Sequence, residues 1–337
     1  MIISASRRTD IPAFYSKWFM NRVRQGSCYV PNPLNVKQVS QVHLNPVDVE
    51  AIVFWSKNPA PLLPHLRELD KLGFHYYFQF TLNAYPLALE PNVPSIKERI
   101  ATFKDLSRHV GPLRVAWRYD PIIVSNFTPF EYHEERFSWI AGELRGSTQR
   151  VMVSLVDYYR KTNRRLSQLE REEDCSFNRD VVSSRGIINL MGNIATVAKK
   201  NDIEIFTCAE ESDFSQVGVQ QGKCIDEGIL NNIWSQKIVY KKDPTQRGAC
   251  LCMLSKDIGI NDTCIHGCPY CYSTSSYGVA QNRYREHDPD SPVLWGRGET
   301  VLVVKQHVNN QIRLLELRSN DIKRCTNSYS CWLHATL

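Results

Sequence analysis

Three cysteines lie close together near the end of the chain, and their spacing is typical of a metal centre. Cys264, Cys268 and Cys271 are separated by three and then two residues, and Tyr270 stands directly before the last of them. Thiolates are soft ligands that suit zinc or the irons of an iron–sulfur cluster. Electron-transfer clusters usually take four cysteines, so a loop with three leaves one iron open to another molecule. The loop therefore predicts a [4Fe–4S] cluster that takes part in a reaction.

A zinc site is the alternative for the same residues. Structural zinc is commonly held by two halves, each a pair of closely spaced cysteines. Cys268 with Cys271 would form one half, and Cys250 with Cys252 the other. Zinc needs neither the longer step from Cys264 to Cys268 nor the tyrosine, so the pattern favours iron and sulfur.

Four further cysteines form a second candidate set, which would hold another [4Fe–4S] cluster or a zinc ion. They are Cys208, Cys224, Cys250 and Cys252. Because they are far apart in sequence, only the fold can assemble them, and we expect a compact tetrad of sulfurs. The alternative is that they are buried thiols that pack as small apolar groups. The other cysteines show no pattern and are expected to be structural or incidental: Cys28, Cys175, Cys325 and Cys331.

Charged side chains follow several predicted strands. Arg7, Arg8 and Asp10 follow the first strand, and Arg118 and Asp120 follow the fourth. Guanidinium groups bind carboxylates and phosphates through paired hydrogen bonds. Arg7, Asp10, Arg118 and Asp120 are therefore candidate catalytic residues for an anionic substrate. The alternative is that they form ion pairs that brace the mouth of the fold.

Three other residues are candidates for binding a cofactor. Tyr270 lies inside the cysteine loop, and Lys57 and Glu210 follow predicted strands. A glutamate at such a place can accept hydrogen bonds from an amino or ribose group.

Six short runs of β-branched and aromatic residues end abruptly in polar residues, which is typical of buried strands. They span residues 2–5, 51–55, 76–80, 113–117, 151–155 and 203–206. Helical patterns cover 60–71, 95–109, 130–144 and 187–200. Alternating strands and helices indicate parallel βαβ units, so we predict an α/β fold, a TIM-like partial barrel of six β/α units, with an open doubly wound sheet as the alternative. Active sites of α/β barrels lie at the carboxyl ends of the strands, where the charged candidates stand.

The predicted domain organisation follows from these elements. Residues 1–245 form the barrel-like domain, 246–290 a cysteine-rich segment that packs on it, and 291–337 a C-terminal tail. The strongly charged stretch 157–182 is expected to be a long loop or lid with some helix.

Composition narrows the functional classes. Of the 337 residues, 42% are hydrophobic and 23% are charged, which is ordinary for a globular protein. The net charge of +6 suits a small-molecule or anionic substrate and does not exclude nucleic acid. No stretch approaches the roughly 18 apolar residues of a membrane span, and the N-terminus does not resemble a signal peptide. We therefore expect a cytoplasmic protein, in which the eleven cysteines are not explained by disulfides.

The cysteine spacing with Tyr270 resembles the signature of the radical S-adenosylmethionine superfamily. The resemblance implies that Cys264, Cys268 and Cys271 bind the cluster and that its open iron chelates S-adenosylmethionine. Reductive cleavage then gives a 5′-deoxyadenosyl radical that abstracts hydrogen from an unknown substrate, with electrons from a donor such as flavodoxin or ferredoxin. A non-catalytic iron–sulfur or zinc module, associated with nucleic acid, is the alternative function.

Two features depart from that signature. The loop follows six strands instead of the first one, so the barrel is permuted or a C-terminal arm folds back over it. No Gly-Gly-Glu follows the loop. The chain also resembles an uncharacterised family, the domain of unknown function DUF1848, which carries such a cluster near its C-terminus. The matching segments, at 4–12, 54–59, 117–122 and 257–259, imply no particular reaction.

Overall fold

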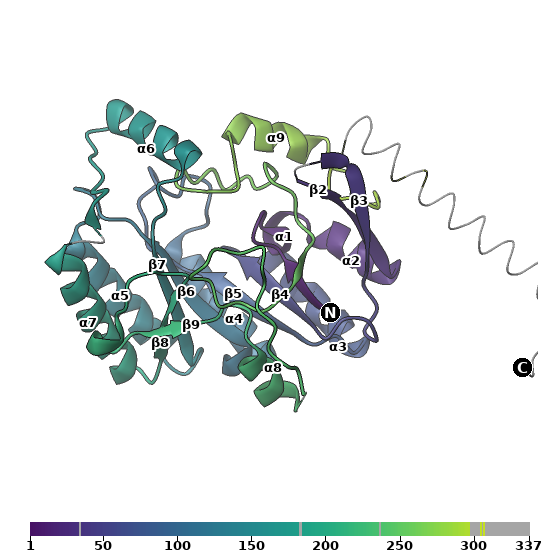
Figure 1. Ribbon diagram of the computed structural model, residues 1–337, viewed down its shortest axis with the longest axis horizontal. Helices are drawn as coiled ribbons and strands as arrows, with labels where there is room; N and C mark the ends of the chain where they lie inside the picture. The colour runs from purple at the N-terminus through teal and green to yellow at the C-terminus, as the bar shows by residue number, and fades with distance from the viewer. Residues whose placement is uncertain (34, 182–183, 236, 297–303, 305, 307–337) are drawn as a thin grey trace, which may run out of the picture.

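An eight-stranded sheet runs through the protein, with helices around it (Figure 1). The computed structural model describes residues 1–296 except 34, 182–183 and 236, together with residues 304 and 306. The strands of the sheet are β1 (Ile2–Ala5), β4 (Ala51–Ser56), β5 (Tyr76–Thr81), β6 (Val115–Ile122), β7 (Arg150–Leu155), β8 (Glu204–Cys208), β9 (Gln220–Gly222) and β10 (Lys256–Asp257). Their order is β10-β1-β4-β5-β6-β7-β8-β9, and each neighbouring pair is parallel. The predicted α/β class is therefore confirmed.

The six predicted strands are β1 and β4 to β8, in the predicted chain order. The fourth of them, β6, continues to Ile122, so Arg118 and Asp120 lie within the strand and not after it. The sequence did not predict β9 and β10, which extend the sheet at its two ends. It also missed a separate antiparallel pair, β2 (Ser27–Asn32) and β3 (Asn35–His43).

Helices connect the strands. They are α1 (Ile11–Phe14), α2 (Ser16–Arg24), α3 (Leu66–Lys71), α4 (Ile96–Val110), α5 (Phe130–Leu144), α6 (Arg160–Glu172), α7 (Arg185–Lys200), α8 (Glu227–Trp234) and α9 (Tyr277–Arg285). Short 3-10 turns are η1 (Ala60–His65), η2 (Pro112–Arg114) and η4 (Ser215–Val217). The predicted helix over 60–71 starts as η1, because Pro64 lacks the N–H that an α-helix needs. The expected lid contains α6.

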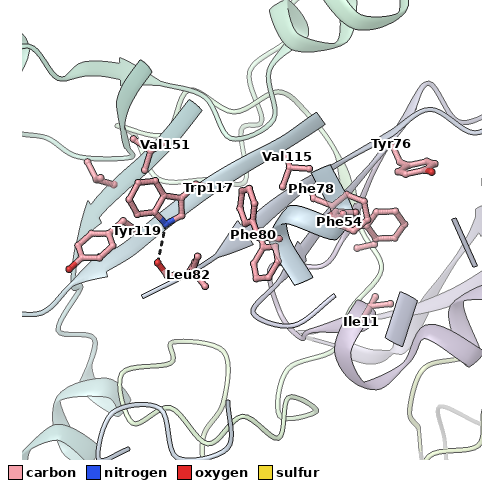
Figure 2. Packing of buried hydrophobic residues seen from close by; sticks show 14 of the residues in the cluster. Ile11, Phe54, Tyr76, Phe78, Phe80, Leu82, Val115, Trp117, Tyr119 and Val151 are labelled. Atoms are coloured by element: carbon pink, nitrogen blue, oxygen red, sulfur yellow. Dashed lines mark hydrogen bonds between the residues drawn. The ribbon is translucent and has the colours of Figure 1, made fainter. Parts of the chain in front are cut away.

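Apolar side chains on one face of the sheet pack against helices α1 to α5 and α7. Phe54 of β4 is paired with Phe78 of β5, so both side chains point to this face of the sheet. Their ring centres are 5.0 Å apart (Figure 2). Trp117 of β6 is fully buried, and its indole N–H donates to the carbonyl oxygen of Leu82 at 3.0 Å. This face forms the main core.

The opposite face of the sheet is covered by residues 224–235 and 237–253. Ile2, Val53 and Tyr77 lie in a second apolar cluster with Leu230 of α8 and with Met253. The hydroxyl of Tyr77 and the amide of Gln79 both donate to the carbonyl oxygen of Cys224, at 2.6 and 2.8 Å. The covering segment is therefore anchored to the sheet by polar as well as apolar contacts.

Part of the predicted tail can be followed. The indole N–H of Trp18 donates to the carbonyl oxygen of Ser291 at 2.9 Å, and Val293 pairs with Tyr29 of β2. The rest of the predicted tail, residues 297–303, 305 and 307–337 with Cys325 and Cys331, lies outside the described residues. Within the described part of the chain, no helix has the length and apolar character that a bilayer crossing demands.

Candidate functional site

A cavity of about 420 Å³ lies where six parallel strands end. Its walls come from the carboxyl ends of β1, β4, β5, β6, β7 and β8 and from the cysteine-rich segment. All seven candidate cysteine ligands line it: Cys208, Cys224, Cys250, Cys252, Cys264, Cys268 and Cys271. So do Arg7, Asp10, Lys57, Arg118, Asp120 and Tyr270. Of the fourteen candidate residues, thirteen therefore line one cavity, and Glu210 does not.

The cysteine loop is attached to the end of β1 through β10, the strand that precedes it. The carboxylate of Asp257 accepts hydrogen bonds from the hydroxyls of Ser4 and Ser6, at 2.8 and 2.6 Å, and from the backbone N–H of Arg7 at 2.8 Å. Gly259 lies directly on β1, because a Cβ at this residue would stand 2.0 Å from Ser6 Oγ. These contacts hold the loop at the carboxyl ends of the strands.

Helix α6 clasps the other side of the loop through one arginine. The guanidinium of Arg165 donates to the carbonyl oxygens of Pro269 at 2.9 Å and of Ser275 at 3.2 Å, and also to those of Cys271 and Thr274. One planar group therefore ties the backbone on both sides of the last cysteine. The predicted lid supplies this contact.

Asp10 connects three elements. Its carboxylate accepts hydrogen bonds from the backbone N–H of Ala13 at 3.0 Å, which caps α1, and from that of Lys57 at 2.7 Å. The ring of His266, inside the cysteine loop, lies 2.8 Å from the same carboxylate. These contacts position the loop, and the catalytic role of Asp10 stays a prediction.

A buried charge network lies beside Cys268. The ammonium group of Lys57 pairs with Glu90 at 2.8 Å, and the hydroxyl of Tyr270 donates to the same oxygen at 2.7 Å. Arg99 binds the other oxygen of Glu90 at 3.1 Å. Burial lowers the pKa of Lys57, but the carboxylate of Glu90 outweighs that effect and raises it, so Lys57 is a cation beside the loop.

Burial also governs the thiols of the loop. It raises the pKa of Cys268 to about 12 and that of Cys264 well above its ordinary value. Buried thiolates need a compensating positive charge, and metal ions are the usual source, because they bind thiolates and release the protons. The chemistry of this donor set, three free thiols beside a lysine, therefore fits a metal cofactor.

The second cysteine set lies in or against one buried apolar cluster. The sulfurs of Cys208 and Cys224 are 2.8 Å apart, and the backbone N–H of Cys224 lies 3.3 Å from the sulfur of Cys252. The metal site and its alternative, buried thiols that pack as small apolar groups, both stay predictions. The two other described cysteines, Cys28 and Cys175, are buried elsewhere.

Arg118 and Arg7 lie next to this set. Arg118 donates to the sulfur of Cys224 at 2.8 Å and pairs with Asp120 in its own strand. Both guanidinium groups stack on Trp55: the central carbon of Arg7 lies 5.0 Å from the ring centre, and that of Arg118 lies 5.1 Å from it. The Arg118–Asp120 pair is an ion pair of the kind that the sequence analysis named as the alternative to a catalytic role.

Glu210 lies beside the cavity, where its carboxylate accepts a hydrogen bond from the backbone N–H of Leu155 at 2.8 Å. Burial and the nearby carboxylate of Asp157 raise its pKa to about 7.

Several residues of the site were not among the sequence candidates. Arg165, Glu90 and Asp257 each make several contacts with the loop or with the ends of the strands. Asp257 lies in the segment 257–259, one of the segments on which the family resemblance rests, so the sequence did offer a signal for this residue. Arg165 and Glu90 are ordinary charged residues in sequence, and only their tertiary contacts distinguish them.

Within the residues the structure describes, no group of three or more His, Cys, Asp or Glu side chains is arranged to hold a single metal ion. The cysteine loop and the second set are therefore predicted metal centres, and the zinc and cluster alternatives both stay predictions.

Comparison with known proteins gives one match. A family model described as a domain of unknown function (DUF1848) matches residues 2–273, which is more than half of the chain. The matched region contains all seven candidate cysteine ligands. No curated protein and no solved structure matches the chain.

Proposed function

Because the chain belongs to the DUF1848 family, whose description states no activity, we propose from the site itself that it is a radical S-adenosylmethionine enzyme acting on an unknown, small or anionic substrate. The observation that carries the proposal is that Cys264, Cys268 and Cys271 all line the cavity at the carboxyl ends of the strands. A cysteine loop on an exposed surface away from the cavity would have argued for a structural metal site instead.

The topology supports the proposal through β10. This strand pairs in parallel with β1 at one end of the sheet and is followed directly by the cysteine loop. It therefore takes the place of a first strand although it comes last in the chain. We infer a permuted partial barrel, in which the loop occupies its usual place relative to the sheet. That arrangement accounts for the six strands that precede the cysteines.

The residues that would hold a [4Fe–4S] cluster are Cys264, Cys268 and Cys271. When bound with S-adenosylmethionine, such a cluster supplies the electron that cleaves the sulfonium and yields a 5′-deoxyadenosyl radical. Lys57 offers a positive charge beside Cys268, held by Glu90. Arg165 fixes the backbone carbonyls around Cys271. The rest of the cavity, with Tyr270 buried in its wall, shields the reacting groups from water.

The test is reductive formation of 5′-deoxyadenosine. The protein is reconstituted anaerobically with iron and sulfide, reduced with dithionite and incubated with S-adenosylmethionine. We expect 5′-deoxyadenosine from the wild type and none above background from Cys268→Ala. Cys28→Ala, which removes a buried thiol away from the cavity, is the matched control and should retain the activity. Equal product from Cys268→Ala and the wild type would refute the assignment, and a colourless protein that holds zinc would favour the non-catalytic module.

A further inference from the structure

We propose that Cys208, Cys224, Cys250 and Cys252 hold a second [4Fe–4S] cluster, with all of its irons bound by the protein. The four thiols come from the end of β8, from the residues after β9 and from the segment between α8 and β10. They lie in or against one buried cluster, although Cys208 and Cys252 are 44 positions apart in sequence. The proposal uses none of the three loop cysteines, so it stands or falls independently of the radical chemistry.

The surroundings of the tetrad are those of an anionic centre. A cubane with four thiolates carries a net charge of about −2, and burying such a charge requires nearby cations. Arg118, which is only 6% exposed, donates to the sulfur of Cys224, and Arg7 lies over Trp55 beside it and lines the same cavity. Two guanidinium groups therefore offer positive charge to a bound cluster, and Asp120 balances part of the charge of Arg118.

Unused hydrogen-bond donors point to the same ligand. Nη2 of Arg7 is buried and has no hydrogen-bond partner, and the indole N–H of Trp55, on which both arginines stack, has none either. Buried donors without partners are costly. The bridging sulfides of a cluster would accept such bonds, whereas a zinc ion bound by four cysteines brings no additional acceptor. This difference favours a cluster over zinc.

Position and ligand count indicate what the second cluster does. The four thiols line the same cavity as the cysteine loop. A cluster with four protein ligands has no open iron for a substrate and is suited to carrying electrons. Its place beside the cavity lets it exchange electrons with groups bound there. The hydrogen bond from Arg118 and the charge of Arg7 would raise its reduction potential, because positive charge near the sulfurs stabilises the reduced form.

Iron counting on three proteins tests the proposal. Each is reconstituted anaerobically with ferrous iron and sulfide in the presence of equimolar zinc, and bound iron, sulfide and zinc are measured. We expect about eight irons for the wild type and about four for the triple variant Cys264→Ala/Cys268→Ala/Cys271→Ala. Cys28→Ala should match the wild type, because this buried thiol belongs to neither set.

The triple variant decides the question, because it leaves the second set intact and needs no substitution among those four cysteines. The proposal would be overturned if the triple variant held no iron while its circular dichroism spectrum showed that it is folded. Zinc bound to the triple variant in place of iron would overturn it as well. If the triple variant forms no 5′-deoxyadenosine but retains four irons, the second cluster is present without the first, and the two proposals are tested separately. In the triple-variant background, Arg118→Gln should make the midpoint potential of the remaining cluster more negative, and an unchanged potential would overturn the role given to Arg118.

Discussion

Replacing Arg165 by alanine should loosen the cysteine loop without touching a cysteine. The guanidinium donates to four backbone carbonyls between Pro269 and Ser275. A hydrogen bond from a charged donor contributes about 1.5–3 kcal/mol. Arg165 is partly exposed, so water can replace some of these bonds. Counting two of the four at the lower value gives about 3 kcal/mol of local stabilisation.

Hydrogen exchange measures this loss directly. Each 1.4 kcal/mol corresponds to a factor of ten, so 3 kcal/mol predicts exchange about a hundred times faster in the peptide that covers residues 262–275. The amides that report it are those of Asp262 and Cys271, which donate to Ser273 and Cys268 at 3.2 and 3.1 Å. Exchange elsewhere, for example in β5, should stay unchanged.

The neighbouring arginine is the matched control. Arg164 is exposed and has one contact with the loop, at the long distance of 3.5 Å to the carbonyl oxygen of Ser275. Arg164→Ala should therefore change exchange by less than about threefold. Two results would contradict the role of Arg165 in stabilising the cysteine loop. One is unchanged exchange of the 262–275 peptide in Arg165→Ala, and the other is equal acceleration of that exchange by both variants.

Two more predictions concern stability. Because the pKa of Glu210 is raised to about 7 from an ordinary value of 4.5, the folded state binds the additional proton between these values, and the free energy of unfolding falls as the pH rises through this window. Urea titrations at pH 5, 6 and 8 should show that Glu210→Gln removes this fall in stability, which is at most about 3 kcal/mol before solvent screening. The exposed Glu211→Gln variant should keep the fall. Identical pH profiles for the wild type and Glu210→Gln would contradict the raised pKa of Glu210. Gly259→Ala should destabilise the protein by about 1–3 kcal/mol, because the new methyl group would stand 2.0 Å from Ser6 Oγ. A methyl group at residue 248 would have no neighbouring atom within 4 Å, so Gly248→Ala should leave the stability unchanged in the same assay.

The strands could be predicted because their composition is local information. Buried parallel strands need β-branched and aromatic residues on both faces, and runs such as 51–55 show this directly. The end of β6 was misplaced because Arg118 and Asp120 are charged, and charge normally marks the end of a buried strand. Here the two pair with each other, and Arg118 also bonds to Cys224. Their burial depends on partners that the local sequence does not reveal.

The loop cysteines could be predicted for the same reason, since their spacing is local. The second set could be suspected only from the presence of thiols, because Cys208 and Cys224 meet only through the pairing of β8 with β9. Glu90 illustrates what was out of reach. It lies in an irregular segment between β5 and α4, and its value to the site comes from Lys57, Arg99 and Tyr270, which are brought together by folding.

The opening segment of the chain links the two cysteine groups. Ser6 and the N–H of Arg7 bind Asp257, just before the cysteine loop, while the carbonyl oxygen of Arg7 accepts a hydrogen bond from Tyr272, just after it, at 2.7 Å. The guanidinium of the same Arg7 lies over Trp55 and lines the cavity that Cys252 of the second set also lines. The backbone of this one residue therefore contacts both ends of the cysteine loop, while its side chain shares the cavity with the second set. Substituting Arg7 should for this reason disturb both centres, which makes it a poor probe of either, whereas Arg165 and Arg118 each report on one.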